Sequence, residues 1–61
     1  MGFVVNTESG YLVDLEEGIF CNDIECAVVF PNNLDKEERR AIYDRLIGAG
    51  EVKRYWYEDK E

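Results

Sequence analysis

Residues 24–50 read IECAVVF, PNN and LDKEERRAIYDRLIGAG in succession, and the rest of the chain is arranged around this stretch. The first part, residues 24–30, is rich in side chains that favour β-strands. Pro31 then stops the strand, and apolar residues recur at helical spacing over the remainder. The pattern predicts a buried strand over about 24–30, a sharp turn, and an amphipathic helix over about 34–48. We expect this strand to be central in the sheet, with an edge strand covered by a partner molecule as the alternative.

Two residues compete for the start of this helix. Asn33 would cap a helix that begins at the next residue, whereas Asp35 would form a capping box with Glu38, three positions later. At the other end, Gly48 or Gly50 would terminate the helix in the left-handed conformation.

The segments before and after this stretch predict further strands. A turn around Gly10 separates the apolar residues 3–5 from an alternating segment, 11–16, so we expect a hairpin over about 2–16. Residues 51–58, EVKRYWYE, predict a last strand in which neither face is purely polar.

Together these elements predict one domain, residues 1–61, of the α+β class. We expect a two-layer sandwich in which a small mixed β-sheet, β-β-β-α-β along the chain, carries the amphipathic helix on one face. A right-handed connection through the helix would place the last strand parallel to the central one. The order of the strands in the sheet does not follow from the sequence.

The sheet face that the helix leaves uncovered is a candidate interface, because it combines apolar and acidic side chains. We expect this face to carry Leu12, Asp14, Glu16, Glu25, Ala27 and Val29.

The charge of the protein is concentrated in its first half. The net charge is -7; residues 1–35 contain seven acidic residues and no Lys or Arg, and residues 36–61 contain seven of each sign. This balance opposes direct binding to nucleic-acid backbones and to anionic membranes. Basic residues that could contact nucleic acid are interleaved with acids, which makes that role weak: Arg39, Arg40, Lys53 and Arg54.

The chain has two cysteines, Cys21 and Cys26, and no histidine. A secreted small scaffold usually carries more cysteines, so we expect two reduced thiols, with a disulfide across a tight bend as the alternative. Two thiols do not complete a zinc site, and the spacing of the acids matches no established calcium loop, so we expect no metal and no other cofactor. With no histidine, the base of a nucleophilic triad would have to be a carboxylate or a lysine, and a chain of 61 residues rarely builds the water-excluding pocket that acid–base catalysis requires, so we do not expect an enzyme.

No run of the sequence approaches the length of a membrane span, and the first residues lack the basic start of a signal peptide. We therefore expect a cytoplasmic location.

These features favour a small acidic protein-binding module, an inhibitor or adaptor that docks on a basic surface of a larger cytoplasmic protein. One variant of this hypothesis is a nucleic-acid mimic, whose carboxylates would occupy a nucleic-acid-binding protein. The residues expected to contact the partner are acidic or apolar: Asp14, Glu16, Glu17, Asp23, Glu25, Val29, Tyr55, Trp56 and Tyr57. The alternative is a homodimeric structural or accessory subunit, in which the acids serve only solubility.

Overall fold

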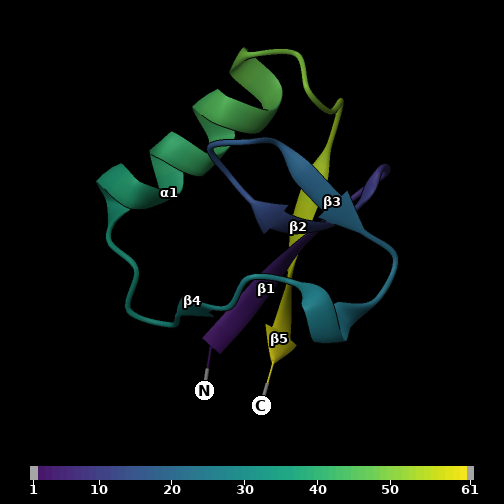
Figure 1. Ribbon diagram of the computed structural model, residues 1–61. Helices are drawn as coiled ribbons and strands as arrows, with labels where there is room; N and C mark the ends of the chain where they lie inside the picture. Colours follow the sequence, from purple (N-terminus) through teal and green to yellow (C-terminus); the bar gives the residue numbers. More distant parts are fainter. Residues whose placement is uncertain (1, 61) are drawn as a thin grey trace.

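The computed structural model describes residues 2–60, and Figure 1 shows one helix packed beside a strongly twisted sheet. The strands are β1 (Gly2–Thr7), β2 (Gly10–Asp14), β3 (Ile19–Cys21), β4 (Phe30–Pro31) and β5 (Tyr55–Lys60). The helical segments are the 3-10 turn η1 (Ile24–Cys26), the α-helix α1 (Lys36–Tyr43) and its π-helical continuation η2 (Asp44–Gly48). The predicted α+β class, with one amphipathic helix against a small sheet, is confirmed.

Strand β1 is the centre of the sheet. It pairs with β5 along its whole length, from Gly2↔Lys60 to Thr7↔Tyr55. It also pairs with β2 at its C-terminal end and with β4 at its N-terminal end. Because β5 occupies one entire edge of β1, β2 and β4 must share the other edge. This position explains why the short apolar run at the start of the chain is buried on both faces.

The core lies between the sheet and the helix. Its buried side chains come from β1, β2, the helical segments and the chain that follows them: Phe3, Val5, Leu12, Ile42, Leu46 and Val52. Asp35 is the N-cap of α1, and its carboxylate accepts a 2.8 Å hydrogen bond from the Glu38 N–H. Of the two candidate caps, the structure therefore uses Asp35. The chain leaves the helix through Gly50, whose φ of 78° favours glycine.

The central strand predicted over 24–30 is wrong. Residues Ile24–Cys26 form η1, whose N-cap is Asp23, and only Phe30 of the predicted strand belongs to a β-strand, β4. The apolar side chains of this segment still contribute to the core, since Ala27 is buried and Val28 packs against it. The segment therefore contributes apolar side chains to the core as a loop and not as a strand.

The predicted mixed sheet is also corrected, because every strand pair within residues 2–60 is antiparallel. The parallel pair depended on a central strand at 24–30, and β1 takes that central place instead. Leu12 was expected on the uncovered face of the sheet, but its side chain is 0% exposed and packs against the helix. Alternation divides a strand into two faces but does not say which of them meets the helix.

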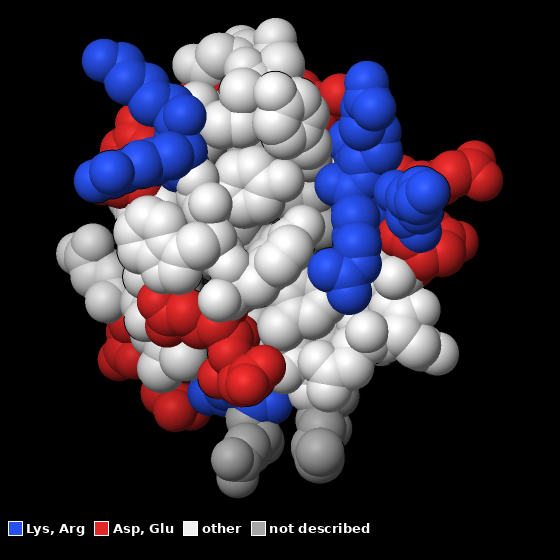
Figure 2. Space-filling model, turned by 180° about the vertical axis from the view of Figure 1, so that it is seen from behind, with Lys and Arg blue, Asp and Glu red and all other residues white. Residues whose placement is uncertain are grey.

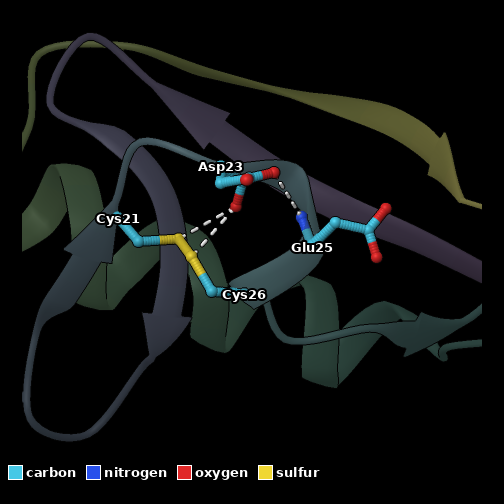
Figure 3. Close-up of a disulfide and its surroundings, with 4 residues drawn as sticks. All are labelled: Cys21, Asp23, Glu25 and Cys26. Carbon is cyan, nitrogen blue, oxygen red and sulfur yellow. Dashed lines mark hydrogen bonds between the residues drawn. A yellow bond between two sulfur atoms is a disulfide. The ribbon is translucent and has the colours of Figure 1, made fainter.

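The two cysteines form a disulfide, so the expectation of reduced thiols is wrong. Figure 3 shows that Cys21, at the end of β3, and Cys26, in η1, close a tight bend around Asp23. Both sulfurs lie within 3.0–3.1 Å of the Asp23 carbonyl oxygen. Because disulfide sulfurs carry no proton, these are S···O contacts. No helical segment among residues 2–60 is long and apolar enough to cross a membrane.

Candidate functional site

Strand β5 presents large aromatic side chains at the edge of the sheet. Tyr57 pairs with Val5, on the face that packs against the helix, and Trp56 pairs with Asn6, on the opposite face. The exposed fractions of Trp56 and Tyr57 are 44% and 39%. Two adjacent aromatic residues are therefore accessible on the two faces of one strand.

Glu8 fixes the place where β5 begins. Its carboxylate accepts hydrogen bonds from the main-chain N–H groups of Lys53, at 2.9 Å, and Arg54, at 3.0 Å. These bonds, the one from Lys53 foremost, hold the pKa of Glu8 below its ordinary value. The turn between β1 and β2 is thereby joined to the chain that enters β5.

A hydrogen-bond cluster around Glu58 orients the indole of Trp56. The Glu58 carboxylate accepts hydrogen bonds from three side chains at 2.9 Å each: Asn6 Nδ2, Trp56 Nε1 and Tyr11 Oη. These donors, Asn6 first, hold the pKa of Glu58 below its ordinary value. In turn, the Glu58 carboxylate raises the pKa of the Tyr11 hydroxyl. The indole is therefore held in place by an ionised partner.

A groove separates β5 from α1 on the helix side of the sheet. It has a volume of about 430 Å³ and is lined by Lys36, Glu37, Arg39, Arg40, Tyr55 and Tyr57. Figure 2 shows an uncharged centre on this face, with a column of basic side chains along the side where α1 lies, further basic side chains on the opposite side and acidic side chains below. The net charge of the protein is -7, so this groove is a local region of opposite sign.

Arg39 is part of the wall of the groove. Its Cζ lies 5.3 Å from the ring centroid of Phe3 and 5.5 Å from that of Tyr57, and its Nε donates to the Leu34 carbonyl at 3.2 Å. These cation–π contacts hold the guanidinium of Arg39 against the rings of Phe3 and Tyr57.

Tyr55 also lines the groove. Burial, followed by a hydrogen bond with the Tyr57 hydroxyl, raises the pKa of Tyr55 to about 12.

The other two cations of the groove, Lys36 and Arg40, are more available than Arg39 for binding an anion. Arg40 donates to Asp44 at 3.2 Å, but both side chains are well exposed, and such helical pairs contribute little. Within residues 2–60, Lys36 has no ion-pair partner. Lys36 and Arg40 lie one helical turn apart and can meet an incoming anion together.

The outer edge of β5 is unpaired, since within residues 2–60 this strand pairs with β1 alone. Thr7 faces Gly10 at the hairpin turn, so the main-chain groups of Thr7 point toward β2. Main-chain groups alternate between the edges, and those of Asn6 therefore point toward its β5 partner, Trp56. The residues of β5 whose N–H and C=O groups point to the outer edge are Tyr55, Tyr57 and Asp59.

The predicted acidic binding residues do not form one surface. Asp14 accepts hydrogen bonds from the N–H groups of Glu16 and Glu17, at 3.0 and 3.2 Å, and shapes the turn after β2. Arg45, in η2, holds this turn through the Glu16 carbonyl at 3.0 Å. Glu25 instead pairs with Lys60 at 3.2 Å, near the C-terminal end of β5. Figure 1 shows the end of the helix and the C-terminus at opposite ends of the molecule.

Asp23 and Val29 are the other non-aromatic residues that were predicted to contact a partner. Asp23 accepts a 3.0 Å hydrogen bond from the Glu25 N–H and caps η1 (Figure 3). Val29 is 49% exposed and lies beside Gly2, at the opposite end of β1 from the Thr7↔Tyr55 pair. Across residues 2–60, no three acidic or cysteine side chains lie close enough to hold a metal ion.

Sequence reasoning identified the aromatic residues of β5 but missed the surroundings that make them a site. The missed residues are Lys36, which lines the groove, and the cluster around the indole of Trp56: Glu58, which accepts its N–H, and Asn6 and Tyr11, which donate to Glu58. The spacing of Lys36 and Arg40 on one helix face was available in the sequence. Their position beside β5 depends on how the helix crosses the sheet, which periodicity does not specify.

Comparison of the chain with protein-family models, with curated proteins and with solved structures finds no match.

Proposed function

We propose that this chain is a small protein-binding module, an inhibitor or adaptor of a larger protein, whose contact surface is centred on strand β5. The observation that carries this proposal is the exposure of Trp56 and Tyr57, 44% and 39%, on a strand whose outer edge is unpaired within residues 2–60. Aromatic side chains dominate the energy of protein interfaces when a partner covers them.

Both aromatic side chains are held in place before any partner arrives. The Trp56 indole donates to Glu58, and the Tyr57 ring packs edge-on against Phe3 with centroids 4.7 Å apart. A side chain that is already ordered loses less conformational entropy on binding. This supports the choice of β5 as the centre of the contact.

The acidic surface adds a second part to the proposal. A net charge of -7 favours a partner with a basic surface, chiefly by accelerating association. Asp14 and Asp23 hold main-chain turns, so the better candidates for this contact are Glu16 and Glu17, which are exposed. If these carboxylates mimic nucleic acid, the module will compete with duplex DNA for its partner, and salt will weaken the competition.

The homodimer remains the second candidate, and the same exposed strand supports it. Two copies could pair their β5 edges and bury Trp56. Sedimentation equilibrium separates the two proposals: a monomer at micromolar concentration contradicts the dimer, and a tight dimer that buries Trp56 contradicts binding of another protein at β5.

A cytoplasmic location is part of the proposal and has its own test. A reducing cytoplasm keeps thiols reduced, whereas the structure has Cys21 and Cys26 paired. Alkylation of the protein in rapidly acidified host cells should label both thiols if the location is cytoplasmic. A largely unlabelled protein would instead place it in an oxidising compartment.

The central test is affinity capture from the native host with three matched baits: wild type, Trp56→Ala and Tyr43→Ala. Tyr43 is the control because it is 45% exposed and lies on α1. We expect wild type and Tyr43→Ala to capture the same protein, and Trp56→Ala to lose it. Circular dichroism checks that each bait is folded. Capture that survives in Trp56→Ala, or no capture by wild type, contradicts the proposal.

A further inference from the structure

We infer that the outer edge of β5 and the groove beside it bind an extended acidic peptide segment, which pairs with β5 as an additional strand. The inference rests on the proposed protein-binding function and specifies the chemistry of the partner at β5. Main-chain pairing would provide part of the affinity, and the side chains beside the strand would select the sequence.

The edge of β5 has what strand addition requires. The strand is six residues long, and within residues 2–60 its outer edge has no strand partner. Exposed edges of this kind are usually protected by bulges, prolines or a covering segment. The main-chain groups that point outward belong to Tyr55, Tyr57 and Asp59, so a peptide can pair at both ends of the strand.

The groove determines which side chains suit the added strand. Alternate residues of the peptide would point to the helix side of the sheet, where they meet Lys36 and Arg40. The groove also contains Arg39 and a single acid, Glu37, so its cations outnumber its anions. Carboxylates in the peptide would therefore be attracted at these positions.

The other face of β5 suits a different kind of residue. The remaining peptide side chains would point to the side that carries Trp56, whose indole is accessible. An apolar side chain there would cover the indole and gain from its burial. The matching segment thus alternates acidic and apolar residues, with the period of two that a β-strand imposes.

Two other occupants fit the surface less well. A nucleic acid carries a long row of negative charges, which the net charge of -7 repels, whereas a short peptide meets only the local cations. A second copy paired through β5 would form one continuous antiparallel sheet with both helices on the same face. That arrangement would bring Lys36 and Arg40 of each copy toward those of the other.

The test follows amide chemical shifts of the ¹⁵N-labelled full chain during titration with a synthetic peptide of about eight alternating Glu and Val residues, long enough to span β5. We expect shifts at the outward amides of Tyr55, Tyr57 and Asp59, and little change in β3. Two control peptides should not bind: one with Lys in place of Glu, and one with alternate main-chain nitrogens methylated. The inference is overturned if the Glu-Val peptide fails to bind at millimolar concentration or if the methylated peptide binds equally well.

Two charge-matched variants test the groove itself. The double variant Lys36→Gln, Arg40→Gln should weaken peptide binding about tenfold, and Lys53→Gln, Arg54→Gln, which changes the net charge equally, should weaken it less than about twofold. Equal effects would show that net charge alone matters and would overturn the role of the groove. A single-stranded DNA oligonucleotide that shifts the same amides at lower concentration would favour nucleic acid instead, and dimerisation through β5 without peptide would favour a second copy.

The two proposals fail in distinguishable ways. If no acidic peptide binds while capture from the host still depends on Trp56, only the acidic-strand inference fails. If the peptide binds as expected but host capture is independent of Trp56, the proposed function fails and the groove remains a peptide site.

Discussion

Glu58 connects three strands through its side chain. Its carboxylate accepts hydrogen bonds from Asn6 on β1, Tyr11 on β2 and Trp56 on β5. All three donors favour the ionised carboxylate, which is why its pKa lies below the ordinary value. One charge at this position therefore orients the indole that we place at the centre of the binding surface.

The single tryptophan makes this interaction measurable. Because the pKa of Glu58 is lowered on folding, the carboxylate stabilises the folded protein above its unfolded pKa, and this contribution is lost as the pH falls through the folded pKa. We expect Trp56 fluorescence to be constant from neutral pH down to below the ordinary Glu pKa of about 4.3 and to change only then.

The variant Glu58→Gln provides the control, since it keeps an acceptor but cannot titrate. Its Trp56 fluorescence should show no transition in this pH range while the protein stays folded. A transition of unchanged midpoint in Glu58→Gln would show that another group is responsible, and a wild-type midpoint above the ordinary Glu pKa would contradict the hydrogen-bond cluster.

At the scale of elements, the start of helix α1 agrees with one of the two capping residues that the sequence allowed. Asp35 caps the helix through the Glu38 N–H, and Asn33 lies outside it. The cap matters here because α1 carries both the core residue Ile42 and the cations of the groove. A frayed first turn would displace Lys36, the first residue of the helix.

Replacing the cap should cost measurable stability. We expect Asp35→Ala to lower the free energy of unfolding by about 1 kcal/mol, because the Glu38 N–H loses its acceptor. Asn33→Ala is the matched control and should change it by less than about 0.5 kcal/mol. Urea denaturation followed by circular dichroism measures both, and a larger loss in Asn33→Ala would reverse the assignment.

At the scale of the whole molecule, the disulfide compensates for a small core. A chain of 61 residues buries a limited fraction of its surface, so its stability is expected to be marginal. The bond between Cys21 and Cys26 ties β3 to η1, the segment that replaces the predicted central strand. Small domains commonly use such a covalent link where the core alone is insufficient.

Removal of the disulfide should therefore destabilise the domain. The two cysteines are 5 positions apart, and for so short a loop the chain-entropy model gives a loss of about 2 kcal/mol for Cys21→Ser, Cys26→Ser. Urea denaturation with and without a thiol reductant measures it. Reductant should lower the wild-type midpoint toward that of the double variant and leave the double variant unchanged; a wild-type midpoint that is insensitive to reductant would contradict a stabilising bond.

Local pattern was enough to predict several elements of this protein. The helix followed from apolar residues at helical spacing together with the candidate caps, and the hairpin followed from alternation around Gly10. The aromatic residues of β5 were also predicted as binding residues, although their role stays a prediction. Each of these features depends on residues close together in the chain, and the physical preferences of such residues can be summed from the sequence.

Tertiary structure decided which apolar segment became the central strand. Residues 24–30 and the run Phe3, Val4 and Val5 both favour β-structure, but only the second lies in a strand, β1, that has neighbours on both edges. Asp23 and the disulfide turn the first segment into η1 and a loop. The groove between Lys36 and Tyr57, and the convergence of Asn6, Tyr11 and Trp56 on Glu58, likewise join residues that are distant in the chain. Such contacts depend on how strands and helix pack together, and the period of a single segment carries no information about its neighbours in space.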